Sequence, residues 1–113
     1  MEKFKVYKDG NKTFFVDTDN YIFAESLARE ASREGHVMTI EENGEPVALF
    51  VKKYEITRTA RGYSIRKKGK YNRFEYLKSI SNGRLIFVCD YTYQKHYKTI
   101  TGARKALERQ FAI

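Results

Sequence analysis

Three short turn signals divide this chain into hairpins. They are Asp9-Gly10, Asn43-Gly44 and Asn82-Gly83, and each lies between runs of β-branched and aromatic residues. Such pairs favour the backbone of a two-residue type I′ turn, whose twist matches that of two antiparallel strands. Because hairpins join strands that are adjacent in the chain, we expect a mainly antiparallel sheet.

The apolar pattern predicts strands and two helices. The strands are expected over residues 4–7, 13–16, 37–42, 45–51, 54–57, 63–66, 74–80 and 85–93. One helix is expected over residues 21–34, because Ala24, Leu27 and Ala31 recur at the spacing of one helical face. The other is expected over residues 102–110, with Thr101 as its N-cap. We therefore predict a compact small α+β domain in the approximate order ββα-ββ-ββββα, with a mainly antiparallel sheet and two helices.

The tight turns also predict which residues face each other. A two-residue loop at Asn43-Gly44 is expected to place Ile40 opposite Val47 and Met38 opposite Leu49. In the hairpin around Asn82-Gly83, strict alternation is expected to place Leu77 and Val88 on one face.

Charge is distributed unevenly along the chain. Residues 1–50 contain six Lys or Arg against ten Asp or Glu, whereas residues 51–113 contain sixteen against four. A strongly basic region favours a polyanionic partner, because its cations neutralise phosphates and release their counterions. At 113 residues the chain fits one domain. We expect a single domain (1–113) with an acidic ββαββ half (1–53) and a basic ββββα half (54–113).

The densest basic segment runs from Arg58 to Arg73 and contains no acidic residue. Its cations are expected to bind phosphates, and its two tyrosines are expected to stack on unpaired bases. The alternative is a solvated loop whose charge keeps the protein in solution. The residues predicted to bind nucleic acid here are Arg58, Arg61, Tyr63, Arg66, Lys67, Lys68, Lys70, Tyr71 and Arg73.

The second helix extends this prediction. Arg104 and Lys105 lie off its apolar stripe, so they are expected to add to the nucleic-acid-binding surface. The alternative is a solvated helix face on which Glu108 pairs with Arg104.

Four aromatic residues follow the last predicted strand pairing: Tyr91, Tyr93, His96 and Tyr97. They could form a stacking platform or pack beneath the second helix. If residues 91 and 93 continue the strand, Tyr91 and Tyr93 are expected on the same face.

No motif in the sequence predicts catalysis. His36, His96 and the single cysteine, Cys89, do not match a zinc-ligand spacing, and no phosphate-binding glycine loop is present. We therefore expect a protein that is not an enzyme and needs no metal or cofactor. One cysteine excludes an intrachain disulfide, which favours a reducing compartment. No stretch has the apolar character of a signal peptide or of the roughly 18 residues that span a bilayer, so a cytoplasmic location without a membrane partner is expected.

The sequence thus predicts a non-enzymatic protein that binds nucleic acid or a nucleoprotein through a basic, tyrosine-containing loop region. The alternative is a protein-interaction module. Small, Lys- and Tyr-rich single domains resemble accessory proteins of bacteriophages and mobile elements. That resemblance implies an inhibitor of a host nuclease or CRISPR-type effector, acting through protein–protein or protein–RNA contacts.

Overall fold

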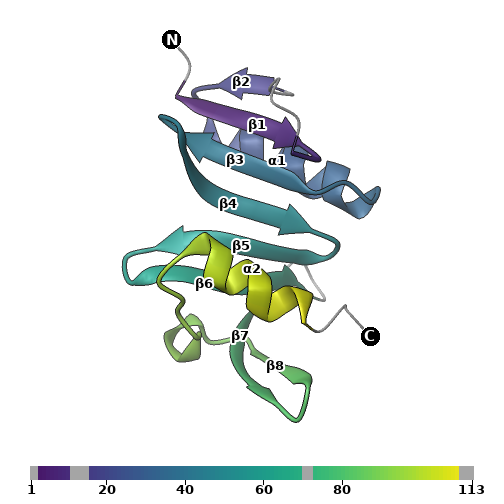
Figure 1. The fold of residues 1–113 in the computed structure, drawn as a ribbon, viewed down its shortest axis with the longest axis vertical. Helices are drawn as coiled ribbons and strands as arrows, with labels where there is room; N and C mark the ends of the chain where they lie inside the picture. The colour runs from purple at the N-terminus through teal and green to yellow at the C-terminus, as the bar shows by residue number, and fades with distance from the viewer. Residues whose placement is uncertain (1–2, 11–15, 70–72, 110–113) are drawn as a thin grey trace. The chain divides into compact units, whose positions relative to one another are not determined.

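The described part of the chain contains eight strands and two α-helices (Figure 1). The computed structural model describes residues 3–10, 16–69 and 73–109. The elements follow the order ββα-ββ-ββββα, and the strand pairings are antiparallel. The predicted α+β class, with a mainly antiparallel sheet and two helices, is therefore confirmed. The chain divides into two units, Met1–Glu55 and Ile56–Ile113, which are described separately.

The first unit is a sheet covered on one face by a helix (Figure 1). Its strands lie in the order β2-β1-β3-β4. They are β1 (Phe4–Lys8), β2 (Val16–Thr18), β3 (Met38–Glu42) and β4 (Glu45–Val51), and the helix is α1 (Tyr21–Arg33). The core of this unit is made by Val6, Ala28, Ile40 and Phe50, all completely buried. Apolar burial of this kind is the main source of the unit's stability.

Local signals determine both ends of α1. The Asn20 side chain accepts a hydrogen bond from the Phe23 amide at 3.1 Å, which makes Asn20 the N-cap. Beyond the last turn, Gly35 adopts φ +102°, a backbone conformation that glycine tolerates best. The helix buries Ala24, Ala28 and Ser32. The predicted boundaries of this helix are accurate to about one residue.

The Asn43-Gly44 turn forms as predicted, with φ +52° and +87°. The register beyond it is not the expected one, because Ile40 lies opposite Ala48 and Met38 lies opposite Phe50. A β-bulge inserts Val47 between the Glu41–Pro46 and Ile40–Ala48 pairs. Pro46 has no amide hydrogen to donate to the ladder, which explains why regular pairing is interrupted there.

The second unit contains the remaining strands and the second helix. Its strand order is β5-β6-β7-β8. The elements are β5 (Tyr54–Thr59), which begins in the first unit, β6 (Gly62–Lys68), β7 (Phe74–Ser81), β8 (Arg84–Val88) and α2 (Ile100–Glu108). Helix α2 packs on β6 (Figure 1) and buries Ala103 and Leu107. Neither helix in the described residues has the length and apolar character needed to cross a bilayer.

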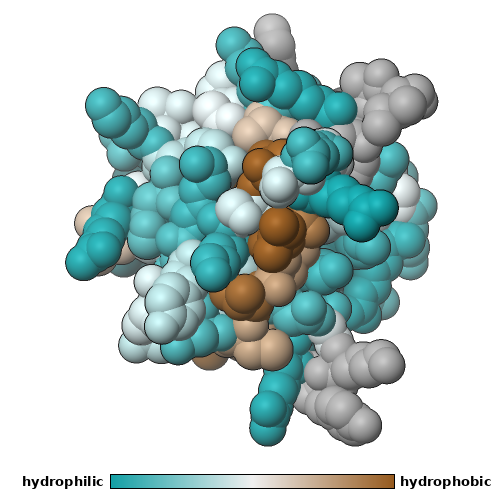
Figure 2. Space-filling view, turned by 90° about the horizontal axis from the view of Figure 1, so that it is seen from below, coloured by the Kyte–Doolittle hydropathy of each residue, from teal (hydrophilic) through white to brown (hydrophobic). Residues whose placement is uncertain are grey.

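The β7–β8 hairpin also departs from strict alternation. Leu77 lies opposite Phe87, and Tyr76 lies opposite Val88, so the predicted Leu77–Val88 face is wrong. The shift occurs between Leu77 and Ser79, where Lys78 is the extra residue of a bulge. Viewed from below, this end of the unit carries a strip of apolar side chains bordered by hydrophilic ones (Figure 2).

The segment after β8 is not a strand. The Asp90 side chain caps a 3₁₀ turn, η2 (Tyr91–Tyr93), by accepting from the Thr92 amide at 2.9 Å. The prediction of a strand reaching residue 93 is therefore wrong, and so is the expected strand face shared by Tyr91 and Tyr93. Helix α2 begins two residues earlier than predicted, because Thr99 and not Thr101 is its N-cap.

Candidate nucleic-acid interface

Strand β6 distributes its three consecutive cations over both faces of the hairpin. Arg66 pairs with Tyr76 across the β6–β7 ladder, Lys67 pairs with Glu75, and Lys68 pairs with Phe74. Since successive side chains point to opposite faces, Arg66 and Lys68 share one face and Lys67 lies on the other. The tight cluster expected from adjacency in sequence is therefore divided.

Aromatic rings hold these cations in place. The Arg66 guanidinium lies 3.9 Å from the centre of the Phe74 ring, and the Lys68 ammonium lies 5.5 Å from the same ring. On the opposite face, the Lys67 ammonium lies 4.5 Å from the centre of the Phe87 ring. Attraction between a cation and the face of a ring orders long side chains without neutralising their charge.

The tip of the β6–β7 hairpin begins at Gly69. The Gly69 amide donates to the Arg73 carbonyl at 2.6 Å, so Lys67 and Lys68 belong to the strand and not to the loop. The Glu75 side chain packs against Gly69, so an acid from just outside the basic segment lies against it. Arg73 is exposed beside this tip. The predicted residues Lys70 and Tyr71 lie outside the described residues.

The other predicted residues are spread over the second unit. Arg58 is exposed on β5, and Tyr63 is half-buried on β6. On α2, Arg104 forms an ion pair with Glu108 at 2.6 Å, as the alternative interpretation expected, while Lys105 is exposed. Arg61 precedes β6 and lies at the end opposite Lys68, about 20 Å away for a strand of this length.

At that opposite end, a pocket of about 390 Å³ opens between the β5–β6 turn and the segment after β8. Pockets that bind small molecules have volumes of about 300–1,000 Å³. The side chains that line it include Thr59, Arg61, Tyr91, Thr92, Gln94 and His96. The pocket thus combines a cation, an imidazole, an amide and an aromatic ring.

Backbone contacts hold the segment after β8, which lines one side of this pocket, against β6. The Tyr63 and Tyr97 amides each donate to the other's carbonyl, at 2.8 and 2.7 Å. Gly62 makes this approach possible, because a Cβ at that position would collide with the Tyr97 carbonyl oxygen. The Asp90 carboxylate holds the η2 turn through the Thr92 amide and hydroxyl, and these bonds lower the pKa of Asp90.

Two buried polar atoms of the segment after β8 have no hydrogen-bond partner in the described structure. They are the Gln94 side-chain oxygen and the Tyr97 hydroxyl. Burial also raises the pKa of Tyr97, so this side chain stays neutral through physiological pH. A buried acceptor without a donor costs about 1–3 kcal/mol.

The histidines and the cysteine do not come together. His36 lies in the first unit, where its Nδ1 is 2.7 Å from the Asp9 carboxylate, whereas His96 lines the pocket. Cys89 is exposed. Within residues 3–10, 16–69 and 73–109, no three His, Cys, Asp or Glu side chains are arranged to hold a metal ion.

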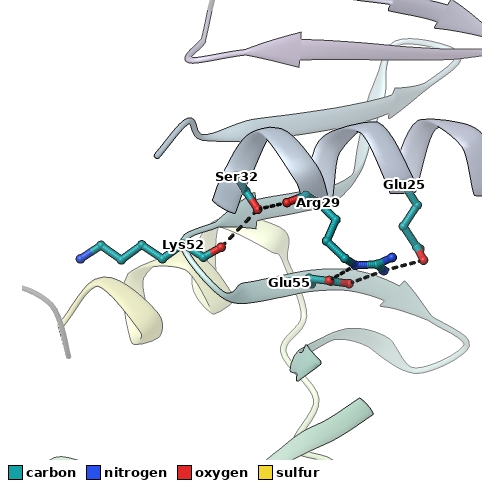
Figure 3. Close-up of polar contacts among 5 residues, drawn as sticks. All are labelled: Glu25, Arg29, Ser32, Lys52 and Glu55. Carbon is teal, nitrogen blue, oxygen red and sulfur yellow. Dashed lines mark hydrogen bonds and ion pairs between the residues drawn. The ribbon is translucent and has the colours of Figure 1, made fainter. Parts of the chain in front are cut away.

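A buried ion cluster in the first unit is structural and not part of this interface (Figure 3). The Arg29 guanidinium bonds to Glu55 at 2.5 and 3.1 Å and to Glu25 at 2.8 Å. The hydrogen bond to Glu55 is the largest of the effects that raise the pKa of Arg29. The Ser32 hydroxyl, near the end of α1, donates to the Lys52 carbonyl at 3.2 Å. The cluster ties α1 to residues 52–55 of the same unit.

No family model, curated protein or solved structure matches this chain.

The candidate interface consists of two parts of the second unit: the ring-supported cations Arg66, Lys67 and Lys68, and the pocket beside Arg61. The aromatic signal around Tyr91 was visible in the sequence. The contribution of Gln94 was not, because only the folded segment brings its side chain beside Arg61.

Proposed function

We propose that this protein binds nucleic acid through its second unit and does so without catalysing a reaction. The observation that carries the proposal is the charge of residues 56–113, which contain fourteen Lys or Arg against three Asp or Glu. Such an excess attracts a polyanion, and release of its counterions supplies affinity that does not depend on sequence.

Three of these cations, on β6, are held in defined positions. Arg66, Lys67 and Lys68 are held against aromatic rings at 3.9–5.5 Å. Cations ordered in this way lose less side-chain entropy when they contact phosphates. Their position on both faces of one hairpin favours a strand that wraps around the hairpin over one that lies flat against a single face.

The test is binding of a fluorescent oligonucleotide by fluorescence anisotropy. The double variant Lys67→Ala/Lys68→Ala is expected to weaken binding about tenfold or more, since two phosphate contacts are lost. The matched control is Arg33→Ala/Lys53→Ala, which removes the same charge from exposed positions in the first unit. Equal weakening by both variants would show that net charge alone matters, and an undetectable interaction of the unaltered protein would overturn the proposal.

A protein-binding function is the second candidate, and the β7–β8 end of the unit favours it. Ile86 is 41% exposed on β8, within an end that shows an apolar strip (Figure 2). Strand β8 is also the last in the strand order, and edge strands can pair with a strand of another protein. A partner that stays bound after nuclease treatment, and that is lost with Ile86→Lys, supports this function. Retention by the variant contradicts it.

A further inference from the structure

We infer that the pocket beside Arg61 holds one unstacked nucleotide, so that the protein prefers single-stranded nucleic acid to duplex. This inference rests on the proposed function and adds the form of the ligand to it. The pocket lies within the second unit, at the end of β6 opposite the Lys68 end. The two sites are separated by the length of β6, a span of about 20 Å.

The pocket offers a separate contact for each part of a nucleotide. Arg61 is exposed at its rim and supplies a cation for a phosphate. Tyr91 is 62% exposed, and its ring is available to stack on a base. Gln94 also lines the pocket, and its side-chain amide can donate to or accept from the edge of a base.

These contacts select an unpaired base. In a duplex, both faces of each base are stacked and its Watson–Crick edge is paired, so Tyr91 and Gln94 could not engage the same base. An unstacked base presents a face and an edge together, while its phosphate remains within reach of Arg61.

Two tyrosines of the same turn provide a matched pair of variants. Tyr91 and Tyr93 are both 62% exposed, but only Tyr91 lines the pocket, whereas Tyr93 lies beneath the Lys78 ammonium at 5.5 Å. Loss of one base-stacking contact is expected to weaken binding about tenfold. Tyr91→Ala should therefore weaken single-strand binding about tenfold and leave duplex binding unchanged, and Tyr93→Ala should alter neither.

The experiment measures fluorescence anisotropy of the full chain with a single strand of about 12 nucleotides, the matching duplex, and polyphosphate of similar length. We expect single-strand binding to be the tightest and to weaken several-fold in Gln94→Leu, which keeps the size of the side chain and removes the acceptor. Circular dichroism of each variant checks that the fold is retained.

Each outcome is decisive. Equal affinity for single strand and duplex, together with equal effects of Tyr91→Ala and Tyr93→Ala, overturns the pocket inference while the proposed function stands. Polyphosphate that binds as tightly as the single strand also overturns it, since charge alone would then explain the affinity. Absence of binding to either nucleic acid overturns the proposed function and the inference together.

Discussion

Among the charged residues that the structure describes in the first unit, Glu55 is the most deeply buried. Its side chain is only 4% exposed, and the Arg29 guanidinium contacts both of its oxygens. A carboxylate removed from water is expensive unless a partner compensates it. The sequence carries the spacing of four along one helix that favours the Glu25–Arg29 pair, which forms at 2.8 Å. It carried no comparable signal for Glu55.

Replacing Arg29 is expected to be costly. Arg29→Met leaves the Glu55 carboxylate buried without its guanidinium, so the free energy of unfolding should fall by about 3–5 kcal/mol in urea titrations. Glu25→Ala, which removes the partly exposed carboxylate of the same cluster, should cost about 1 kcal/mol or less. If the two variants are equally destabilised, the burial of Glu55 does not determine the effect.

Asp9 provides a pH-dependent contact in the same unit. Its carboxylate accepts from the Val37 amide at 2.8 Å and lies 2.7 Å from His36, and these bonds, that of Val37 first, lower the pKa of Asp9 below 3.8. A lowered folded-state pKa stabilises the protein above 3.8, and this contribution disappears as the pH falls through the lowered value.

Thermal unfolding of Asp9→Asn as a function of pH checks this contact. The variant should melt below the unaltered protein at neutral pH, and the two melting temperatures should converge at pH values well under 3.8. A difference that stays constant over the whole pH range would contradict an electrostatic role for the carboxylate.

At the level of elements, the tight turns determine where the hairpins form, but the β-bulges determine which side chains share a face. Asn43-Gly44 and Asn82-Gly83 both form turns with positive φ, as the sequence predicted. The bulges at Val47 and Lys78 then shift which side chains share a face. A bulge depends on packing against neighbours on both sides, so alternation within one strand does not reveal it.

Gly62 determines how the segment after β8 docks on β6. It combines φ +130° with the close approach of the Tyr97 carbonyl, so Gly62→Ala introduces backbone strain and a collision. We expect a loss of about 2–4 kcal/mol in unfolding free energy, measured by denaturant titration.

The matched control for this prediction is Gly83→Ala. Gly83 also has positive φ, at +75°, but no atom lies within 4 Å of the added Cβ. Its cost should be about 1 kcal/mol, from backbone strain alone. Equal losses in the two variants would show that the contact with Tyr97 adds nothing to the strain.

At the level of the whole molecule, charge asymmetry is the property with the widest consequence. The formal net charge of the chain is +8. Residues 56–113 contain fourteen Lys or Arg against three Asp or Glu, whereas residues 1–55 contain eight against eleven, so the positive charge comes from the second unit. If the proposed function holds, the logarithm of the binding constant should fall linearly with the logarithm of salt concentration, by about 0.7–0.9 per phosphate neutralised. Anisotropy titrations over a range of salt concentrations measure this slope, and affinity that does not change with salt would exclude a phosphate ligand.

The Asn43-Gly44 and Asn82-Gly83 turns, the two helices and the division of charge were determined by the sequence alone, whereas the strand predicted over residues 13–16 lies mostly outside the described residues and β2 begins at Val16. Each is a local property: a Gly that tolerates positive φ, an apolar period, or a count of ionisable groups. The cations at 58–73 were identified for the same reason, as consecutive letters with no acid between them.

Only the tertiary structure decided how those residues are grouped. The packing of Glu75 on Gly69 brings an acid to the basic segment, and the Phe74 and Phe87 rings lie against Arg66 and Lys67 on opposite faces of the hairpin. Gln94 and Arg61 meet in one pocket although they are distant in sequence, and Glu55 is buried against Arg29. These contacts depend on which strands pair and where a bulge falls, and such long-range choices are made by the free energy of the whole fold and not by any local pattern.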